Sequence, residues 1–195
     1  MQNLFLKISL REINKQILLF MKKMFFVAIA TFGFTFSSNA QNVDFGATAG
    51  YHNLIVRASA DGISASDGAS GFYFGLFADF SISDKFHIQP ELQYASVSQD
   101  GGTGNEIIVP VMAKYYPAAN FYLQAGPNFD LIIDDSEGVN DFGFGLAGGL
   151  GYDFTEKFFA SARYSFGLSE RLQEDIGFDV STKFNFLQIG VGYKF

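Results

Sequence analysis

Cysteine and tryptophan are absent from the 195 residues of the sequence, and basic residues are scarce in most of it. Without cysteine, the chain has neither a disulfide framework nor a thiolate metal site. After residue 40, eight Lys/Arg stand against 19 Asp/Glu. This acidic balance disfavours nucleic acid as a partner, because nucleic-acid binding needs a basic surface. Beyond Gln41 there is also no run of 18 apolar residues, so no transmembrane helix is predicted there.

One apolar run does occur near the start, where residues 21–40 have the pattern of a secretory signal peptide. Lys22 and Lys23 form a charged start, an apolar run of 13 residues follows at 24–36, and the small residues Ser38 and Ala40 precede a cleavage site. The rival interpretation is a membrane anchor, but a spanning helix needs about 20 apolar residues. We therefore expect a cleaved signal at 21–40.

The signal divides the sequence into three parts. Residues 1–20 are expected to be an upstream extension or leader that lies outside the fold. Residues 21–40 are the signal peptide, and residues 41–195 are expected to form one domain.

After the cleavage site, apolar residues recur at every second position, which is the side-chain period of a β-strand. Frequent Phe (25) and Gly (21) also favour strands and tight turns over helices. Eight segments of about ten residues show this period, and that length suits a tilted strand that crosses a bilayer. The segments are 43–52, 72–81, 86–95, 107–115, 121–130, 142–153, 159–168 and 187–195. The region just before the last segment is ambiguous, because Phe184 and Phe186 sit in the other phase.

The connections between these segments alternate in length. The short ones are 82–85, 117–120 and 154–157. The longer, polar ones are 56–70, 99–105, 132–140 and 169–182. Within the first of these, 57–71 has the Gly/Ser/Ala composition of a flexible loop. Short turns on one side and long loops on the other are typical of an outer-membrane barrel.

Period alone cannot say which face of the sheet points outward, and a soluble barrel or sandwich would bury the apolar face. Three features favour an apolar face in lipid. This face carries almost no charge, and the other face is too rich in Gly, Ser, Gln, Asn and Asp for a dry core. Aromatic residues also gather near strand ends, as in interfacial girdles: Tyr94, Tyr115, Phe121, Tyr152, Phe158, Tyr193 and Phe195. Since only closed barrels satisfy every strand hydrogen bond in lipid, we predict an all-β fold, an eight-stranded antiparallel up-and-down transmembrane β-barrel over 41–195.

Four stretches carry a family resemblance, namely 86–102, 107–133, 159–168 and 187–195. They resemble the small outer-membrane β-barrel family of Gram-negative bacteria often labelled PorT-like or porin family, over essentially 42–195. The resemblance implies an eight-stranded barrel in the cell outer membrane and little about activity. Pro90 and Pro127 fit the family pattern. Because proline removes a ladder hydrogen bond, each is expected to face lipid at a bulge or local kink.

The interior of an eight-stranded barrel is just wide enough for side chains to fill it. We predict a plug of paired charges in which Arg163 and Lys114 reach inner carboxylates, because lone buried charges are costly. Inward glycines over 143–151 would leave room beside Phe159 and Arg163. The alternative is an ion or proton path along the carboxylates. The predicted plug comprises Asp44, Asp79, Glu91, Lys114, Asp130, Arg163 and Lys194.

Motifs for catalysis, a cofactor or a metal are not recognised in the sequence. His52 and His87 are expected at opposite rims of the barrel, so they would not form one site, and each is expected to bond a neighbour. The acidic stretch 134–141 lacks the spacing of an EF-hand loop. A weaker alternative is that its carboxylates share divalent cations with the outer leaflet.

The last segment, LQIGVGYKF, places Val191, Tyr193 and Phe195 on the apolar face. A terminal aromatic there resembles the signal that barrel-assembly machinery reads. The expected partners are therefore outer-membrane lipid, this machinery and an envelope or surface protein. We expect an integral outer-membrane protein without catalytic activity, with a structural or surface-interaction role through its long loops. The alternatives are a loop-mediated binding module or secretion-assembly partner and, less favoured, a narrow pore or a lipid-modifying enzyme.

Overall fold

The structure is a computed structural model. The predicted signal peptide at 21–40 and the segment 1–20 lie outside the residues that it describes. In the described part, no helix is long and apolar enough to span a membrane. The described residues are 43–60, 63–134, 139–171 and 180–195.

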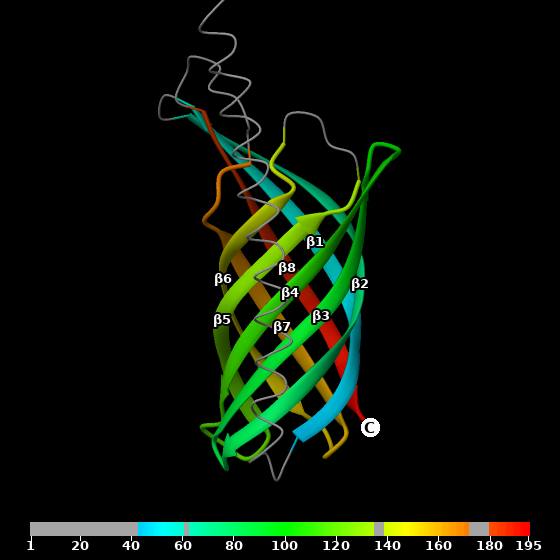
Figure 1. The fold of residues 1–195 in the computed structure, drawn as a ribbon, viewed down its shortest axis with the longest axis vertical. Coiled ribbons are helices and arrows are strands. Elements are labelled where there is room, and N and C mark those ends of the chain that lie inside the picture. Colours follow the sequence, from blue (N-terminus) through cyan, green and yellow to red (C-terminus); the bar gives the residue numbers. More distant parts are fainter. Residues whose placement is uncertain (1–42, 61–62, 135–138, 172–179) are drawn as a thin grey trace, which may run out of the picture. The chain divides into compact units, whose positions relative to one another are not determined.

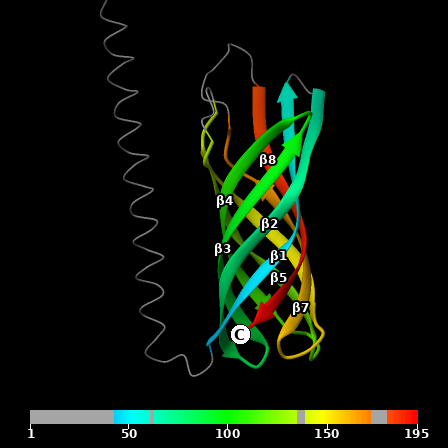
Figure 2. The ribbon, with the colours of Figure 1, turned by 90° about the vertical axis from the view of Figure 1, so that its right-hand side faces the viewer.

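Eight strands occur in the described residues, and they form one closed antiparallel barrel (Figure 1). Each strand pairs with the next in the sequence, and the last pairs with the first, which confirms the predicted up-and-down order. The strands run tilted along the barrel (Figure 2). They are β1 (Val43–Ala60), β2 (Ile63–Ser83), β3 (Phe86–Gln99), β4 (Gly102–Tyr115), β5 (Phe121–Ile132), β6 (Phe142–Asp153), β7 (Phe158–Gly167) and β8 (Val180–Lys194).

The apolar face of the barrel points outward, as the sequence predicts. In β2, Phe72, Phe74 and Leu76 are 54, 53 and 61 % exposed. Their neighbours Tyr73 and Phe77 point inward and are almost fully buried. The same alternation places glutamine, aspartate and arginine side chains in the interior. The barrel therefore has an apolar outer surface and a polar interior, the reverse of a soluble barrel.

The expected flexible loop at 57–71 is wrong. β1 and β2 stay paired until Ala60 meets Ile63, so most of this segment belongs to a long hairpin. The loop was predicted from composition, because Gly, Ser and Ala have a low intrinsic preference for strands. Here these residues lie in strands because they pair with neighbouring strands.

The expected loop at 99–105 is also shorter than predicted. β3 and β4 pair until Gln99 meets Gly102, and only Asp100 and Gly101 form the turn. Both have positive φ, at 49° and 83°. A two-residue hairpin turn of this kind matches the twist of its strands, and aspartate and glycine are residue types that tolerate the left-handed conformation.

The prolines interrupt the ladder without a bulge. Pro90 and Pro127 lie on the outer face as expected. Along β2 and β3, pairing stops after Phe77 with Glu91 and resumes at Phe80 with Ile88, in unchanged register. Of the two expected alternatives, a bulge or a local kink, the bulge is therefore excluded at Pro90.

The phase of the first part of β8, which the sequence leaves ambiguous, is the same as that of the rest of the strand. β8 pairs with β1 in one unbroken register from Val180 to Lys194. Phe186 therefore points inward, where its ring lies 5.3 Å from that of His52. The interior accepts an apolar ring at this level because it covers a buried histidine.

We expect Leu146→Arg to lower the free energy of unfolding by about 2–4 kcal/mol, because Leu146 points outward in the middle of β6 and the charge would enter hydrocarbon. Phe154→Arg is the matched control. Phe154 is similarly exposed but lies in the turn after β6, so its cost should be about 0–1 kcal/mol. Urea unfolding in phospholipid vesicles measures both values. Equal losses would contradict a hydrocarbon belt around the middle of the barrel.

Candidate functional site

The barrel interior contains many polar and charged side chains. Inward positions of all eight strands carry side chains that can donate or accept hydrogen bonds, and most of them are almost fully buried. Buried groups of this kind are stable only when they are paired. The buried polar residues are Thr48, His52, Asp79, Gln89, Glu91, Gln93, Glu106, Lys114, Gln124, Asn128, Asp130, Ser161, Arg163, Ser165, Arg171, Asn185 and Gln188.

Asp79 is the centre of the cluster nearest the short turns. Lys114 Nζ lies 3.1 Å from Asp79 Oδ2, and His87 Nδ1 lies 2.9 Å from Asp79 Oδ1. Lys194 Nζ approaches the same carboxylate at 3.8 Å. Lys114 also donates to Gln89 Oε1, which links this cluster to the next. A buried carboxylate with this many donors is held in one position.

Glu91 forms the middle of the interior. Arg163 Nη2 and Gln89 Nε2 each donate to Glu91 Oε1 at 2.8 Å. Gln93 Nε2 donates to the other oxygen, Glu91 Oε2. Because these donors come from β3 and β7, the carboxylate ties two well-separated walls of the barrel together.

His52 continues the chain of hydrogen bonds toward the long loops. Gln188 Nε2 donates to Gln93 Oε1 at 2.9 Å and also lies 3.2 Å from His52 Nδ1. Because an amide nitrogen only donates, His52 Nδ1 accepts here and His52 Nε2 carries the hydrogen. That nitrogen bonds Glu106 Oε1 at 2.8 Å. An unbroken series of hydrogen bonds thus runs from His87 to Glu106 along the interior.

Arg171 closes the interior at the loop end, and the sequence did not predict this role. Its Nη2 contacts Asp130 Oδ2, and its Nη1 donates to the Asn140 carbonyl at 3.1 Å. The guanidinium also lies 4.5 Å from the Phe184 ring centroid. Gly143 leaves room for the guanidinium, because a Cβ on Gly143 would lie 2.0 Å from Arg171 Nη2 and would displace it.

An aromatic layer lies at the turn end of the interior. Phe77, Tyr116, Tyr122 and Phe159 form one buried cluster. The Lys114 ammonium sits 4.4 Å from the Tyr122 ring centroid and 5.2 Å from that of Phe159, a cation–π arrangement. These rings fill space at the turn end beside the Asp79 cluster.

Tyr116 anchors this layer from just beyond the end of β4. Burial raises the pKa of its phenol above the ordinary value, and the nearby Asp153 carboxylate raises it further. Tyr116 is therefore a neutral donor, and its hydroxyl bonds Asp153 Oδ2 at 3.1 Å. This bond fixes the ring against the wall formed by β6.

The structure brings most of the predicted plug residues together in pairs. Lys114 meets Asp79, Arg163 meets Glu91, and Asp130 meets Arg171 rather than either of the two expected cations. Asp44 is a correction. Its side chain is 55 % exposed and lies 3.7 Å from Lys194 Nζ, so it belongs to the rim and not to the interior. The first residues of β1 simply lie outside the enclosed part of the barrel.

The inward glycines of β6 also have different neighbours from those expected. A Cβ on Gly151 would lie 2.1 Å from the Tyr122 ring, so that ring fills the space beside β6. Gly149 does approach Arg163, as predicted. The ring of Phe159 instead covers Gly192 of β8.

The predicted assembly-signal residues line the outer wall at the end of β8. Val191, Tyr193 and Phe195 are 60, 36 and 72 % exposed. The rings of Tyr193 and Phe195 lie 6.1 Å apart, and Tyr193 lies 4.8 Å from the ring of Phe158. The three side chains are therefore free to contact lipid or protein.

The two histidines lie at different levels of the barrel, and each bonds a carboxylate. His52 does not lie at a rim as expected, because its side chain is fully buried in the interior. His52 contacts Glu106 and Gln188, and His87 contacts Asp79. Within the described residues, no group of three or more His, Asp or Glu could hold a metal ion. Of the acidic stretch 134–141, residues 135–138 lie outside the described part. The Asp134 carboxylate accepts from the Asn105 backbone N–H and side chain.

Residues 25–195 match the family described as "Outer membrane protein beta-barrel domain". No curated protein matches the sequence significantly. Neisserial surface protein A is a similar solved structure, with 19% identity and a TM-score of 0.48, covering 80% of this chain and 100% of that one. Ail of Yersinia pestis shows 16% identity and a TM-score of 0.49, with the same coverage of 80% and 100%. OprG from Pseudomonas aeruginosa shows 18% identity and a TM-score of 0.42, covering 78% and 95%.

We expect Arg163→Met to lower the free energy of unfolding by about 3–5 kcal/mol, because Glu91 would keep a buried charge without its cation. Adding Glu91→Gln should recover much of this loss, since no lone charge would remain. Lys183→Met is the control. It removes a 3.9 Å pair with Glu170 between side chains that are 42% and 51% exposed, and should cost about 1 kcal/mol or less.

Urea unfolding in vesicles measures the three variants against the parent. A double variant that loses at least as much stability as Arg163→Met alone would contradict the view that charge compensation is what this pair provides.

Proposed function

The chain belongs to the outer membrane protein beta-barrel domain family and lies in the outer membrane, and on this premise we propose that it is a closed, non-catalytic barrel that presents a sheet for surface contacts. The membrane anchor is the barrel itself. The contact surface is formed by strands that continue beyond it on the loop side. A cleaved signal peptide at 21–40 would direct the chain to the envelope.

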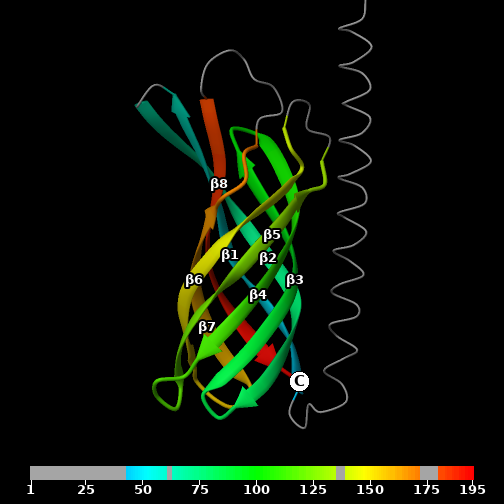
Figure 3. The same cartoon turned by 60° about the vertical axis from the view of Figure 1, so that its left-hand side comes forward.

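The observation that carries this proposal is the unequal length of the strands. β2 pairs with β3 only as far as Ser70 with Ser98, and β7 pairs with β8 only as far as Ser165 with Phe186. β1 nevertheless pairs with both β2 and β8 until Ala60. A three-stranded sheet of β2, β1 and β8 therefore extends past the other strands (Figure 3). We call residues 54–60, 63–69 and 180–185 the projecting sheet.

The two edges of the projecting sheet differ. Along β8, Arg171 N donates to Thr182 O at 2.9 Å, and Glu170 Oε2 accepts from Thr182 N at 2.9 Å. That edge is therefore covered. Along β2, no strand within the described residues pairs with the outer side of 63–69. An open edge of this kind offers backbone donors and acceptors to an extended segment of another protein.

The sealed interior supports an anchor rather than a pore. Paired charges fill the barrel from Asp79 to Glu106, and the aromatic layer lies at the turn end. A barrel of this size leaves room for side chains and little else. The ion-paired side chains hold one another in place, which is the arrangement of a structural network rather than of a reactive centre.

The class of partner follows from the sequence resemblance to PorT-like proteins. A secretion or assembly protein of the envelope is therefore included among the candidates for the projecting sheet. Barrel-assembly machinery is a separate proposed partner, supported by the exposed Val191, Tyr193 and Phe195 at the end of β8.

Shortening the projecting sheet should remove surface contacts and leave the barrel intact. Residues 57–66 are replaced by Asn-Gly, which joins the paired residues Val56 and Asp67 through a two-residue turn and keeps the register. We expect normal heat-modifiable migration in outer-membrane fractions, together with loss of crosslinks formed from a photoreactive group at Ser70.

The control changes the other end of the barrel. Asp84→Asn with Lys85→Gly places the same Asn-Gly turn between β2 and β3 on the turn side. It should leave every crosslink from Ser70 unchanged. Crosslinks that survive the shortening of the hairpin would overturn the role assigned to the projecting sheet.

The sealed interior predicts the electrical behaviour of the protein. In a planar bilayer, the purified barrel should give no steady, reproducible open steps, because the Glu91–Arg163 and Asp79–Lys114 pairs occupy the lumen. Single-channel recording measures this directly. Regular steps that persist across preparations would replace the anchor with a narrow pore.

A further inference from the structure

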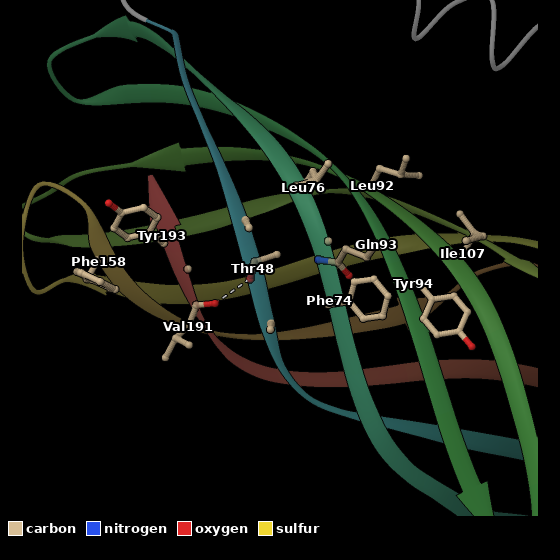
Figure 4. Close-up of a pocket in the computed structure, with 14 residues that line it drawn as sticks. Thr48, Phe74, Leu76, Leu92, Gln93, Tyr94, Ile107, Phe158, Val191 and Tyr193 are labelled. Carbon is tan, nitrogen blue, oxygen red and sulfur yellow. Dashed lines mark hydrogen bonds between the residues drawn. The ribbon is translucent and has the colours of Figure 1, made fainter. Parts of the chain in front are cut away.

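A groove of about 710 Å³ lies on the outer wall of the barrel (Figure 4). Its floor is β1, where Ala47 and Ala49 point outward. Its walls are the large side chains of the neighbouring strands. The lining includes Phe74 and Leu76 of β2 on one side and Val191 and Tyr193 of β8 on the other. Beyond β2 it continues to Leu92 and Tyr94 of β3 and Ile107 of β4.

Strand register explains the groove. Ala47 pairs with Leu76 on one side and Tyr193 on the other, and Ala49 pairs with Phe74 and Val191. A row of methyl groups therefore lies between two rows of bulky side chains.

The floor of the groove is held in place from inside. Thr48 lies between the two alanines and points inward, where its hydroxyl donates to the Val191 carbonyl at 3.1 Å (Figure 4). The same hydroxyl lies 3.3 Å from Tyr73 Oη. These contacts fix β1 against β8 and β2 on the inner side of the groove. The groove is therefore a stable feature of the barrel wall.

A cation stands at the turn end of the groove. Lys157 Nζ lies 5.6 Å from the ring centroid of Tyr193, which lines the groove together with Phe158. The turn that carries Lys157 is fixed, because Lys194 N donates to the Lys157 carbonyl at 2.8 Å and Thr155 Oγ1 accepts from Lys157 N at 3.2 Å. The backbone of this turn is therefore fixed, and it presents the ammonium group of Lys157 beside the apolar groove.

We propose that this groove binds a phospholipid of the surrounding bilayer, with an acyl chain over Ala47 and Ala49 and the phosphate at Lys157. Hydrocarbon fits the trough because an unfilled hollow loses dispersion contacts along its lining. Lysine near a membrane surface attracts anionic lipid, and its ammonium donates charge-assisted hydrogen bonds to phosphate. The short turns of such barrels face the periplasm, so the lipid belongs to the periplasmic leaflet.

The inference rests on the location in the outer membrane and is independent of the role of the projecting sheet. The lining of the groove comes from β1 to β4, β7 and β8, and it shares no residue with the projecting sheet. Each can therefore fail a test without the other.

The absence of tryptophan gives a direct test, because one added tryptophan is the only indole in the protein. Phe158→Trp reports from the groove. Tyr115→Trp is the matched reporter, since Tyr115 is an exposed aromatic at the end of β4 and outside the groove. Both full-length proteins are placed in phosphatidylcholine vesicles with increasing dibrominated phosphatidylglycerol, whose bromines quench tryptophan fluorescence.

We expect F158W to be quenched as if the brominated lipid were enriched about fivefold over its level at Y115W. Lys157→Gln in the F158W protein should bring quenching down to the Y115W level. Lys85→Gln, which removes a turn lysine between β2 and β3, should leave it unchanged. Ala49→Phe should also abolish the enrichment by filling the trough while the ammonium remains.

Equal quenching of F158W and Y115W would overturn the proposal. So would enrichment that persists in Lys157→Gln. If Ala49→Phe does not give a heat-modifiable barrel, Lys157→Gln alone decides, because Lys157 lies in an exposed turn. Protection of F158W from all brominated lipid, with a dimer that Ala49→Phe converts to a monomer, would instead assign the groove to a second copy of the chain.

Discussion

The structure depends on one constraint, which is that backbone N–H and C=O groups must be paired where the strands meet hydrocarbon. The pairing of β1 with β8 satisfies it by closing the sheet, from Gly46 with Lys194 to Ala60 with Val180. Once the sheet is closed, the two-residue period of each strand determines which side chains point outward and which point inward. One phase meets lipid and the other is enclosed. The facing of the side chains is thus a consequence of this closure.

Enclosure then dictates what the interior contains. Water cannot solvate the inward side chains as bulk solvent would, so each carboxylate needs a cationic partner from elsewhere in the chain. Asp79, Glu91 and Asp130 each have one, in Lys114, Arg163 and Arg171. The glutamines bridge these pairs, which makes the interior a continuous network rather than a set of separate bridges. Such a network specifies one arrangement of the walls.

The sequence was sufficient for the number of strands, which follows from local periodicity. It was also sufficient for their order and facing, which follow from the alternating connection lengths and from the near absence of charge on one face. It was not sufficient for contacts that closure alone creates. Arg171 follows β7 in a polar stretch, and nothing local indicates that it reaches Asp130 over Gly143. Asp44 has the inward phase, yet it lies too close to the rim to be enclosed. The Ser/Ala/Gly residues at the end of β1 and the start of β2 lack the apolar pattern of a strand. They are in strands because they pair with neighbouring strands.

β1 has a particular position in this fold, because it is the strand on which both proposed contact surfaces depend. Its ladders with β2 and β8 continue without a gap, from Val43 and Gly46 up to Ala60. By contrast, the ladders beside the prolines of β3, β4 and β5 are interrupted. A strand so firmly paired on both sides needs little stabilisation from its outward side chains, so it can carry alanines that leave a groove. The same pairing allows it to continue past the barrel, where β3 and β7 no longer support the sheet. Because β1 is hydrogen-bonded along its whole length, its outward side chains and its loop end are available for contacts with other molecules.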